Sequence, residues 1–407
     1  MSRVFVAGMG AVSPAGWTVA DLRAALDQGQ PLPIQPVVRP GREKPMQSRE
    51  VPNPSARPDF MAHPRLRRTS PITHYAAAVA LEAVANLRAS RNGSSRLGLV
   101  VCLQSGCVNY CCRFYDETLK DPSTASPLLF PETVYAAPAS HLATLLKNVS
   151  LAYTLVGDPA CFLQGAALGA QWLEENRVDA CLIIGAEESN WIMADALWHI
   201  ERPAVIASGG GALCLSCDPE LSVGVELTAI TDPHTYSARN SRVQAAQAMR
   251  NQLGKSSTGE LLCDGLGDSP RTDAPELAAW SNWTGSRVSP KRILGEGLMA
   301  AAAWQCVAAC DAVATGRFAA ANVSLVGSNH QAIGARFARA KAASGSPDRE
   351  PSRLAAATTA PGHSGFSSSQ AGSYVLRAGT ARGPIQGLLR HCVPVGSSIS
   401  HFSQSGS

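Results

Sequence analysis

Hydrophobic positions along the chain fall into two kinds of run, one typical of strands and the other of helices. Short runs such as "RLGLVVCL" and "DACLIIGAEE" are apolar on both faces, which predicts strands buried in a sheet. Longer Ala-rich runs between them predict helices. In the first half of the sequence, strands are expected at residues 3–9, 96–103, 179–188 and 211–217, and helices at 70–87 and 161–175.

The second half of the sequence repeats this alternation. Strands are expected at residues 222–230, 321–329 and 372–379, and helices at 241–253 and 295–316. Apolar strands separated by helices predict a parallel sheet that is covered on both faces. The polar stretches at 38–68 and 341–353 predict surface loops.

Two of the expected helices are apolar all round, the one that follows Cys161 and the one that follows Gly295. Such a helix must be buried on every side. We therefore predict a layered α/β body in which helices lie between sheets. The last residues, 391–407, predict a flexible tail.

Composition and charge exclude several classes of protein. The chain has 407 residues, of which 45% are hydrophobic, so it can bury a large core. The net charge is only +4, and the basic run "HPRLRR" at 63–68 predicts a solvated surface rather than a nucleic-acid interface. No apolar run approaches the length of a membrane span, and the opening residues lack the pattern of a signal peptide. We expect a cytoplasmic protein.

The sequence predicts no metal and no cofactor. Most of its twelve cysteines stand inside apolar runs, which favours reduced, buried thiols. The CxxC at 214–217 lies in an expected strand without a second ligand pair nearby. The glycine turn at 8–16 has Ser13 where a dinucleotide-binding motif needs its third glycine.

One cysteine is placed as a nucleophile would be. In "GDPACFLQGAALGA" a polar turn precedes Cys161, which begins an expected helix. The positive end of a helix dipole favours the thiolate form of a cysteine, and the thiolate is the reactive form.

These pieces, in this order, resemble the β-ketoacyl-(acyl carrier protein) synthases of the thiolase superfamily. The resemblance lies in the opening strand and turn, in the cysteine segment just quoted, in "SPKRILGEGLMAAAAW" and in "GHSGFSSSQAGSYVL". It implies a dimeric, five-layered αβαβα sandwich of two related halves. We expect the halves at residues 1–220 and 221–390.

The chemistry of that family assigns roles to particular positions. A cysteine takes an acyl group from the acyl carrier protein, and two histidines donate hydrogen bonds to the thioester oxygen during condensation. The resemblance places the nucleophile at Cys161. It places the motif Lys-x-x-x-Gly-His at Lys291, Gly295 and Glu296, so that a glutamate stands where the family has a histidine.

The second histidine is also replaced. Its motif survives downstream in Asp273 and Glu276, and the histidine position itself falls on Gly265, or on Asp264 after a shift of one residue. In the terminal turn, Phe366 is retained, whereas Ser367 and Ser368 replace two glycines. Phe162 follows the cysteine, where the family has small or polar residues. The resemblance implies that Phe162, Phe366 and His363 contact the acyl substrate.

These replacements oppose the ordinary condensation reaction. We expect Glu296 to form an ion pair with Lys291, which would leave no hydrogen-bond donor for an enolate. Loss of both donors implies a barrier higher by roughly 6 to 8 kcal/mol.

Two hypotheses follow. The first is a partner subunit like the chain length factors of type II polyketide or fatty acid biosynthesis, which binds acyl carrier protein and forms a heterodimer with an active ketosynthase, or else a homodimer. The second is an acyltransferase or ketosynthase with altered chemistry, in which Cys161 holds an acyl group, Glu296 or Asp264 acts as base, and His363 is a candidate replacement for a missing donor.

Overall fold

Most of the strands join into one mixed sheet that contains the same strand order twice. The computed structural model describes residues 3–41, 43–87, 95–200, 205–237, 239–254, 257, 259–327 and 331–341. In the first half the spatial order is β5-β4-β6-β8-β1. These strands are β1 (Val4–Val12), β4 (Leu97–Leu103), β5 (Val149–Val156), β6 (Ala180–Glu187) and β8 (Gly209–Ser216).

The second half has the equivalent order, β12-β11-β13-β14-β9. Its strands are β9 (Val225–Ile230), β11 (Leu261–Cys263), β12 (Ser286–Val288), β13 (Ala320–Val326) and β14 (Gln331–Arg339), with the short β10 (His234–Thr235) beside β14. Strands β1 and β9 pair antiparallel and join the halves. The repeated order shows two related halves. The boundary expected at residues 220 and 221 stays a prediction, and residues from 342 onward lie outside the described part.

The prediction of a parallel sheet was only partly right. The strands that flank β4 and β11 are parallel to them, but β8 and β14 run antiparallel to their neighbours. Apolar runs indicate that both faces of a strand are buried, whereas they carry no information on its direction. The expected strand at 372–379 lies outside the described residues.

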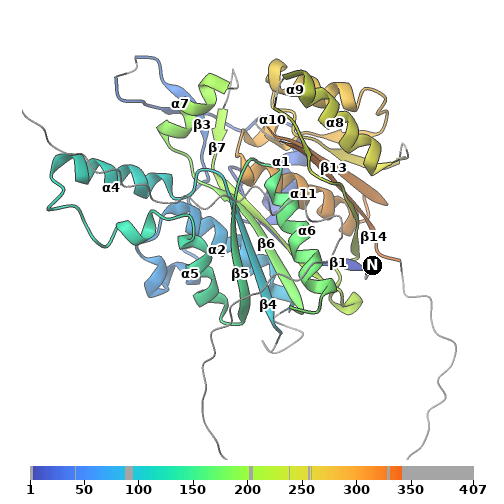
Figure 1. The fold of residues 1–407 in the computed structure, drawn as a ribbon, viewed down its shortest axis with the longest axis horizontal. Coiled ribbons are helices and arrows are strands. Elements are labelled where there is room, and N and C mark those ends of the chain that lie inside the picture. Colours follow the sequence, from blue (N-terminus) through green and yellow to red (C-terminus); the bar gives the residue numbers. More distant parts are fainter. Residues whose placement is uncertain are drawn as a thin grey trace, which may run out of the picture. The chain divides into compact units, whose positions relative to one another are not determined.

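The helices form three layers around the strands (Figure 1). Helices α2 (Pro71–Ala83) and α5 (Ala137–Leu146) pack on the first half of the sheet, and α8 (Arg239–Leu253) and α9 (Pro270–Ala279) pack on the second. Helices α6 (Cys161–Glu174) and α11 (Met299–Ala314) lie between, where each contacts strands of both halves. This arrangement is the predicted αβαβα sandwich.

Helix α11 is the centre of the core. Every residue from Met299 to Val313 is buried, as its apolar sequence predicts. The indole nitrogen of Trp304 donates hydrogen bonds to the carbonyl oxygens of Val12 (3.0 Å) and Gly210 (2.9 Å). These bonds attach the helix to β1 and β8. Helix α1 (Val19–Gln28) packs on its outer side.

A smaller sheet lies beside the main one. It has the order β2-β3-β7 and is formed by β2 (Gln35–Val37), β3 (Met46–Arg49) and β7 (Val205–Ala207). Helix α7 (Trp191–Ile200) packs against it. Residues 38–68 were expected to be a surface loop, but Met46, Ser48 and Arg49 of β3 are buried. Strand β3 gains this burial by pairing with β7, which is remote in sequence.

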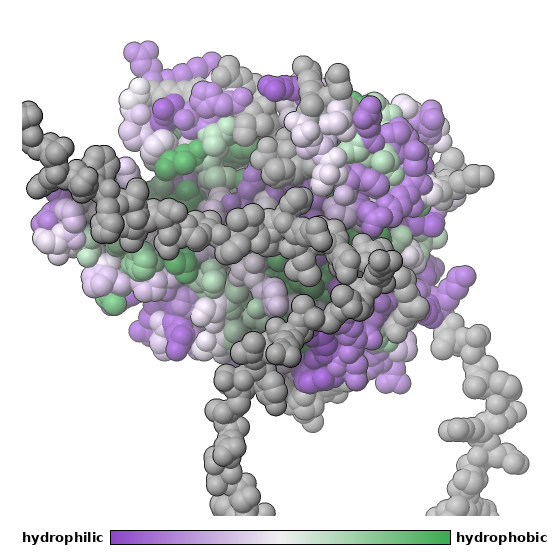
Figure 2. All heavy atoms as spheres, viewed as in Figure 1, coloured by the Kyte–Doolittle hydropathy of each residue, from purple (hydrophilic) through white to green (hydrophobic). Residues whose placement is uncertain are grey.

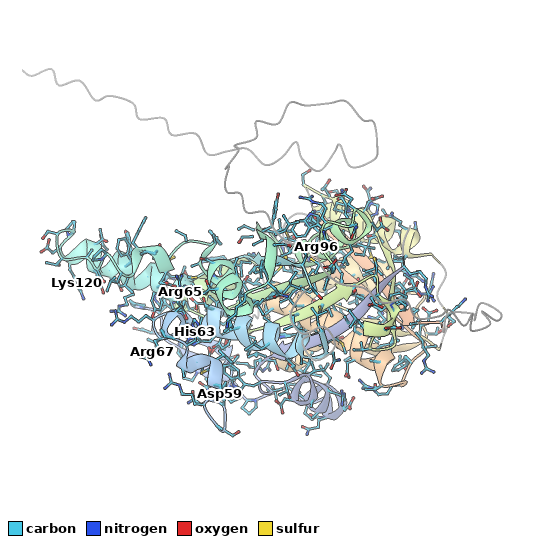
Figure 3. All side chains as sticks on the ribbon, turned by 90° about the horizontal axis from the view of Figure 1, so that it is seen from below. Asp59, His63, Arg65, Arg67, Arg96 and Lys120 are labelled. Atoms are coloured by element: carbon cyan, nitrogen blue, oxygen red, sulfur yellow. The ribbon has the colours of Figure 1, made fainter. Side chains whose placement is uncertain are left out.

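Two further elements lie at the surface. Helix α4 (Val108–Lys120) and the 3-10 turn η3 (Phe130–Glu132) carry several exposed side chains. The basic run at 63–68 contains the 3-10 turn η2 (Pro64–Leu66), and its arginines are exposed, as predicted (Figure 3).

Among the described residues, no helix is long and apolar enough to cross a membrane.

The glycines of the opening turn serve close packing rather than nucleotide binding. A β-carbon on Gly8 would clash with the carbonyl oxygen of Ala83, and one on Gly10 would clash with that of Val79. Strand β1 therefore approaches the backbone of α2 more closely than any side chain would permit.

We predict that Gly10→Ala lowers the free energy of unfolding by about 1 to 3 kcal/mol, because the added methyl group forces β1 away from α2. Urea denaturation measures this change. Gly259→Ala is the control, since its β-carbon would enter open space, and we expect a change within about 0.5 kcal/mol. Equal stability of the two variants would contradict the close packing.

Candidate active site

Cys161 begins helix α6, as the sequence predicts. Strand β5 ends at Val156, a short turn follows, and the Cys161 amide donates a hydrogen bond of 2.9 Å to the carbonyl oxygen of Asp158. The side chain is buried, and a β-carbon on Gly157 would lie 3.3 Å from its sulfur. A cysteine in the first turn of a helix meets the positive end of the helix dipole.

Several small or apolar side chains pack close to the cysteine. The thiol of Cys102 donates a long hydrogen bond of 3.8 Å to the carbonyl oxygen of Cys161, and burial holds the pKa of Cys102 well above its ordinary value. Cys161 belongs to the same hydrophobic cluster as Phe162 and Ala300.

Phe162 marks the place where the two buried helices meet. It is completely buried. A β-carbon on Gly185 of β6 would lie 2.9 Å from Cδ2 of Phe162 and 2.7 Å from the carbonyl oxygen of Met299. The first turns of α6 and α11 thus converge at Gly185. A contact between Phe162 and an acyl chain stays a prediction.

Lys291 and Glu296 form the expected ion pair. The ammonium nitrogen of Lys291 lies 2.5 Å from Oε2 of Glu296, and each side chain has only about a tenth of its surface exposed. Oε1 of Glu296 accepts a hydrogen bond of 2.7 Å from the amide of Leu298. Both carboxylate oxygens are therefore engaged by groups of this chain.

The backbone holds Glu296 firmly in this position. Its amide donates to the carbonyl oxygen of Val205 (2.7 Å), and its carbonyl oxygen accepts from the amide of Ala207 (2.9 Å), both on β7. Gly295 has a φ of +97°, which a glycine adopts without strain. Leu298 has a φ of +49°, a strained value for a leucine. The bond from its amide to Glu296 helps to stabilise that strained turn.

Asp264 lies at the carboxyl end of β11 and is completely buried. Its Oδ1 accepts from the amide of Leu266 at 3.2 Å, and its Oδ2 lies 3.3 Å from Nε of Arg287 on β12. Burial raises the pKa of this carboxyl, while the Arg287 charge opposes the rise. Oδ1 thus accepts a hydrogen bond, whereas Oδ2 has the ion pair with Arg287 but no hydrogen bond within the described part of the chain.

Gly265 faces Glu276 of helix α9. Its amide donates to both Oε1 and Oε2 of Glu276, each at 3.2 Å. Burial, with the nearby charge of Asp264, raises the pKa of Glu276 to about 8. The amide of Gly267 donates to Asp273 in the same way at 3.1 Å. Our sequence-based choice of site residues omitted Glu276, although its place in the family motif could have indicated it.

The loop after β11 and the short helix α10 (Pro290–Leu294), which precedes α11, belong to one site. A β-carbon on Gly267 would lie 3.7 Å from Cβ and 3.8 Å from Cδ of Lys291. The Lys291 charge also opposes the rise in the pKa of Glu276. The structure therefore brings together Asp264, Gly265, Glu276, Lys291 and Glu296.

No histidine of the described residues is hydrogen-bonded to this site. The ring nitrogens of His74, His141 and His234 instead bond to Leu66, Glu132 and Gln252, far from the site in sequence. His363 and Phe366, which were predicted to contact substrate, lie outside the described residues. The catalytic and binding roles of the predicted site residues stay predictions.

Comparisons with known proteins support the fold. No family model and no curated protein matches the sequence. The ishigamide ketosynthase/chain length factor structure matches with a TM-score of 0.70 and 17% identity, covering 84% of this chain and 100% of that chain. A type II polyketide ketosynthase, in complex with its acyl-carrier protein, matches with a TM-score of 0.66 and 15% identity over 83% of this chain and 99% of that one.

A third structure holds a ketosynthase in complex with its chain length factor from Xenorhabdus doucetiae. It matches with a TM-score of 0.67 and 14% identity, covering 83% of this chain and 98% of that chain. At such low identity these likenesses establish that the chain has the ketosynthase and chain length factor fold.

We predict that Glu276→Gln flattens the pH dependence of stability. The native carboxyl has a pKa of about 8 against an ordinary value of 4.5, so the native state binds more protons between these values. Its contribution to stability is complete below about pH 4.5 and is lost as the pH rises through 8.

The unfolding free energy is measured in urea from pH 5 to 8. It should fall with pH less steeply in this variant than in the wild type, and the two slopes should differ by up to about 1.4 kcal/mol per pH unit. Glu187 also has a pKa of about 8, so part of the slope should remain. Glu226→Gln is the control, because Arg3 lowers the pKa of Glu226 out of this range. An unchanged slope in Glu276→Gln would disprove the assignment.

Proposed function

Because the chain has the ketosynthase and chain length factor fold, we propose that it acts as a chain-length-factor-like partner of an active ketosynthase in type II polyketide or fatty acid biosynthesis. One observation carries this proposal. The position of a family histidine holds Glu296, whose two carboxylate oxygens are bound by the Lys291 ammonium group and by the Leu298 amide.

The chemistry of condensation explains why this arrangement matters. A thioester that becomes enolate-like needs hydrogen-bond donors aimed at its oxygen. The Glu296 carboxylate is an acceptor and would repel that oxygen. Gly265 has no side chain, and its amide already donates to Glu276. Neither position supplies a donor, so we expect the ordinary reaction to be slower by several orders of magnitude.

The surface next to the cysteine segment favours a partner chain. Among the described strands, β5 pairs with β4 on one side only, so it is an edge strand. Tyr153 and Val156 of β5 have 50% and 53% of their surface exposed. An apolar edge strand without a neighbour is a ready site for strand pairing with another chain. Since β5 leads directly into Cys161, such a partner would lie close to the candidate site.

A second apolar surface supports the same inference. Tyr115 and Leu119 of α4, together with Leu128 and Phe130 before and within η3, are more than half exposed. Figure 2 shows hydrophobic residues on the surface near α4. Exposed apolar groups of this size are typical of protein interfaces. We infer that a ketosynthase subunit, or a second copy of this chain, covers them.

The remaining partners follow from the same proposal. The acyl carrier protein would deliver acyl chains to the complex, as it binds the ketosynthase in one of the matching structures. No cofactor is required for thioester transfer. The described cysteines are all free thiols, which favours a reducing compartment such as the cytoplasm.

One observation favours the alternative, an acyltransferase that depends on Cys161. The cysteine is retained at the start of a buried helix. In addition, Glu276 of α9, which accepts a hydrogen bond from the Gly265 amide, has a carboxyl pKa of about 8. A carboxyl with such a pKa can act as a general base near neutral pH.

We predict that Val156→Lys weakens dimer formation at least tenfold, because a charge on the edge strand opposes pairing. Light scattering and sedimentation would measure the mass of the chain alone and of the chain coexpressed with a ketosynthase subunit. Val243→Lys, at an exposed valine of α8, is the matched control and should leave the dimer intact. Equal effects of the two variants would exclude β5 as the interface.

We predict that Cys161→Ala leaves product formation by the complex within about twofold of wild type, because the partner ketosynthase holds the reacting acyl group. Peptide mass spectrometry after incubation with acyl-(acyl carrier protein) should show no stable acyl group on Cys161. Cys112→Ala, which removes a partly exposed thiol, controls for nonspecific labelling. Stable acylation of Cys161, with loss of product in Cys161→Ala, would instead support the acyltransferase.

A further inference from the structure

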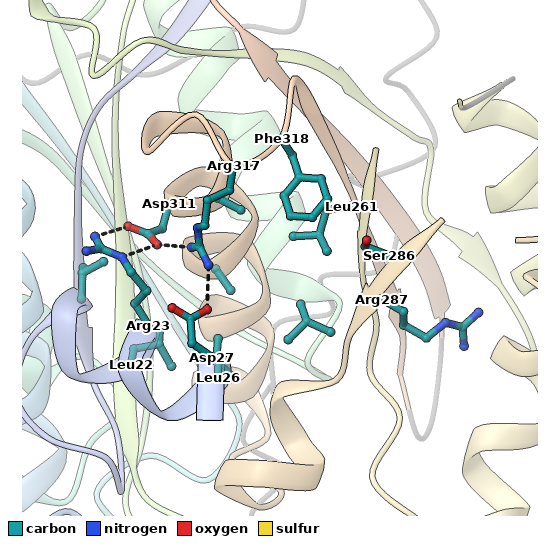
Figure 4. A pocket seen from close by; sticks show the side chains of 14 residues that line it. Leu22, Arg23, Leu26, Asp27, Leu261, Ser286, Arg287, Asp311, Arg317 and Phe318 are labelled. Carbon is teal, nitrogen blue, oxygen red and sulfur yellow. Dashed lines mark hydrogen bonds and ion pairs between the residues drawn. The ribbon is translucent and has the colours of Figure 1, made fainter. Parts of the chain in front are cut away.

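A separate cavity of about 270 Å³ lies between helix α1, the C-terminal half of α11, and strands β11 and β12 (Figure 4). Asp311, one of its lining residues, follows Met299 by twelve positions in α11. At 1.5 Å per residue, it is about 18 Å from the end of α11 that meets Cys161. The cavity is therefore distinct from the candidate active site, and its volume lies just below the usual range for small-molecule pockets.

One wall of the cavity is a chain of ion pairs. Arg23 of α1 donates from Nε and Nη2 to the two oxygens of Asp311, at 2.8 and 2.6 Å. Arg317 donates from Nη2 to Asp311 at 2.7 Å and from Nη1 to Asp27 at 2.8 Å. Paired bonds of this kind fix the orientation of a guanidinium group. Both arginines are thus held in place before any ligand binds.

The two arginines and two aspartates of this wall balance in formal charge, but Asp27 is more exposed to water than either arginine. Two guanidinium groups share Asp311, which is the buried carboxylate of the network. The other carboxylate, Asp27, has 56% of its side chain exposed, so water screens much of its charge. In addition, Nη1 of Arg23 has no hydrogen-bond acceptor among the described residues.

The rest of the lining is largely apolar. It is formed mainly by aliphatic and aromatic side chains, namely Leu26, Leu261, Val288, Ala308, Ala312 and Phe318. Figure 4 shows Leu261 and Phe318 facing the ion pairs across the cavity, with Ser286 beside them, while the guanidinium group of Arg287 points away. Apolar surface of this kind favours the hydrocarbon part of a ligand.

From this lining we propose that the cavity binds a small amphipathic monocarboxylate, with the carboxylate on the guanidinium group of Arg23 and a short aliphatic or aromatic body against Leu261 and Phe318. Guanidinium groups bind a carboxylate with two parallel hydrogen bonds. A polyphosphate would need more positive charge than this wall supplies. A neutral apolar molecule would leave Nη1 of Arg23 without an acceptor.

Binding of benzoate to the full-length chain tests this proposal. Isothermal titration calorimetry at constant ionic strength should show saturable binding at one site. Benzyl alcohol, which has the ring without the charge, should bind at least tenfold more weakly. Arg23→Met should weaken benzoate binding at least tenfold as well, because it removes Nη1, the Arg23 nitrogen that has no acceptor among the described residues.

Two cavity-blocking variants complete the experiment. Ala308→Leu fills the interior, and Ser286→Trp covers the exposed rim without disturbing the core, so one of them can be tested even if the other folds poorly. Each should weaken benzoate binding at least tenfold at an unchanged unfolding temperature. Absence of saturable binding, or equal benzoate affinity in a folded blocking variant, would overturn the proposal.

Discussion

Helix α11 has no side that faces water, and this constraint organises the rest of the molecule. A helix that is apolar all round must be covered by hydrophobic surfaces in every direction. Two sheet halves with the same strand order supply those surfaces, and α6 lies with α11 between them. The bonds from Trp304 to β1 and β8 fix the position of α11 between the layers.

The same constraint creates the candidate site. Since α6 and α11 are both enclosed, their first turns meet inside the protein, near Gly185. A charged side chain in the buried turn before α11 requires a partner, because an unpaired charge is costly to bury. Glu296 has Lys291 as its partner. The arrangement satisfies the carboxylate electrostatically, and for the same reason it offers nothing to stabilise a developing negative charge on a substrate.

The two ends of α11 show the effect of the helix dipole. Glu296 precedes the N-terminus, where a negative charge is favourable. Asp311 lies near the C-terminus, where a carboxylate is unfavourable unless cations surround it. Arg23 and Arg317 provide those cations. The unfavourable placement of Asp311 is offset by an ordered pair of guanidinium groups. These groups also line the cavity between α1, α11, β11 and β12.

The sequence by itself predicted the layered fold, the buried helices and the position of Cys161, because hydrophobic periodicity and helix-start signals are local properties of the chain. It also predicted the Lys291–Glu296 pair, since only four residues of short helix and turn lie between the two. It did not predict strand β5, whose mixed exposure gives no buried run, or strand β3, which depends on its pairing with β7. Only the tertiary structure decided that Gly265 donates to Glu276, and that Arg23 and Arg317 share Asp311. These contacts join residues of different helices, strands and loops, and the local hydrophobic pattern does not specify which of them meet.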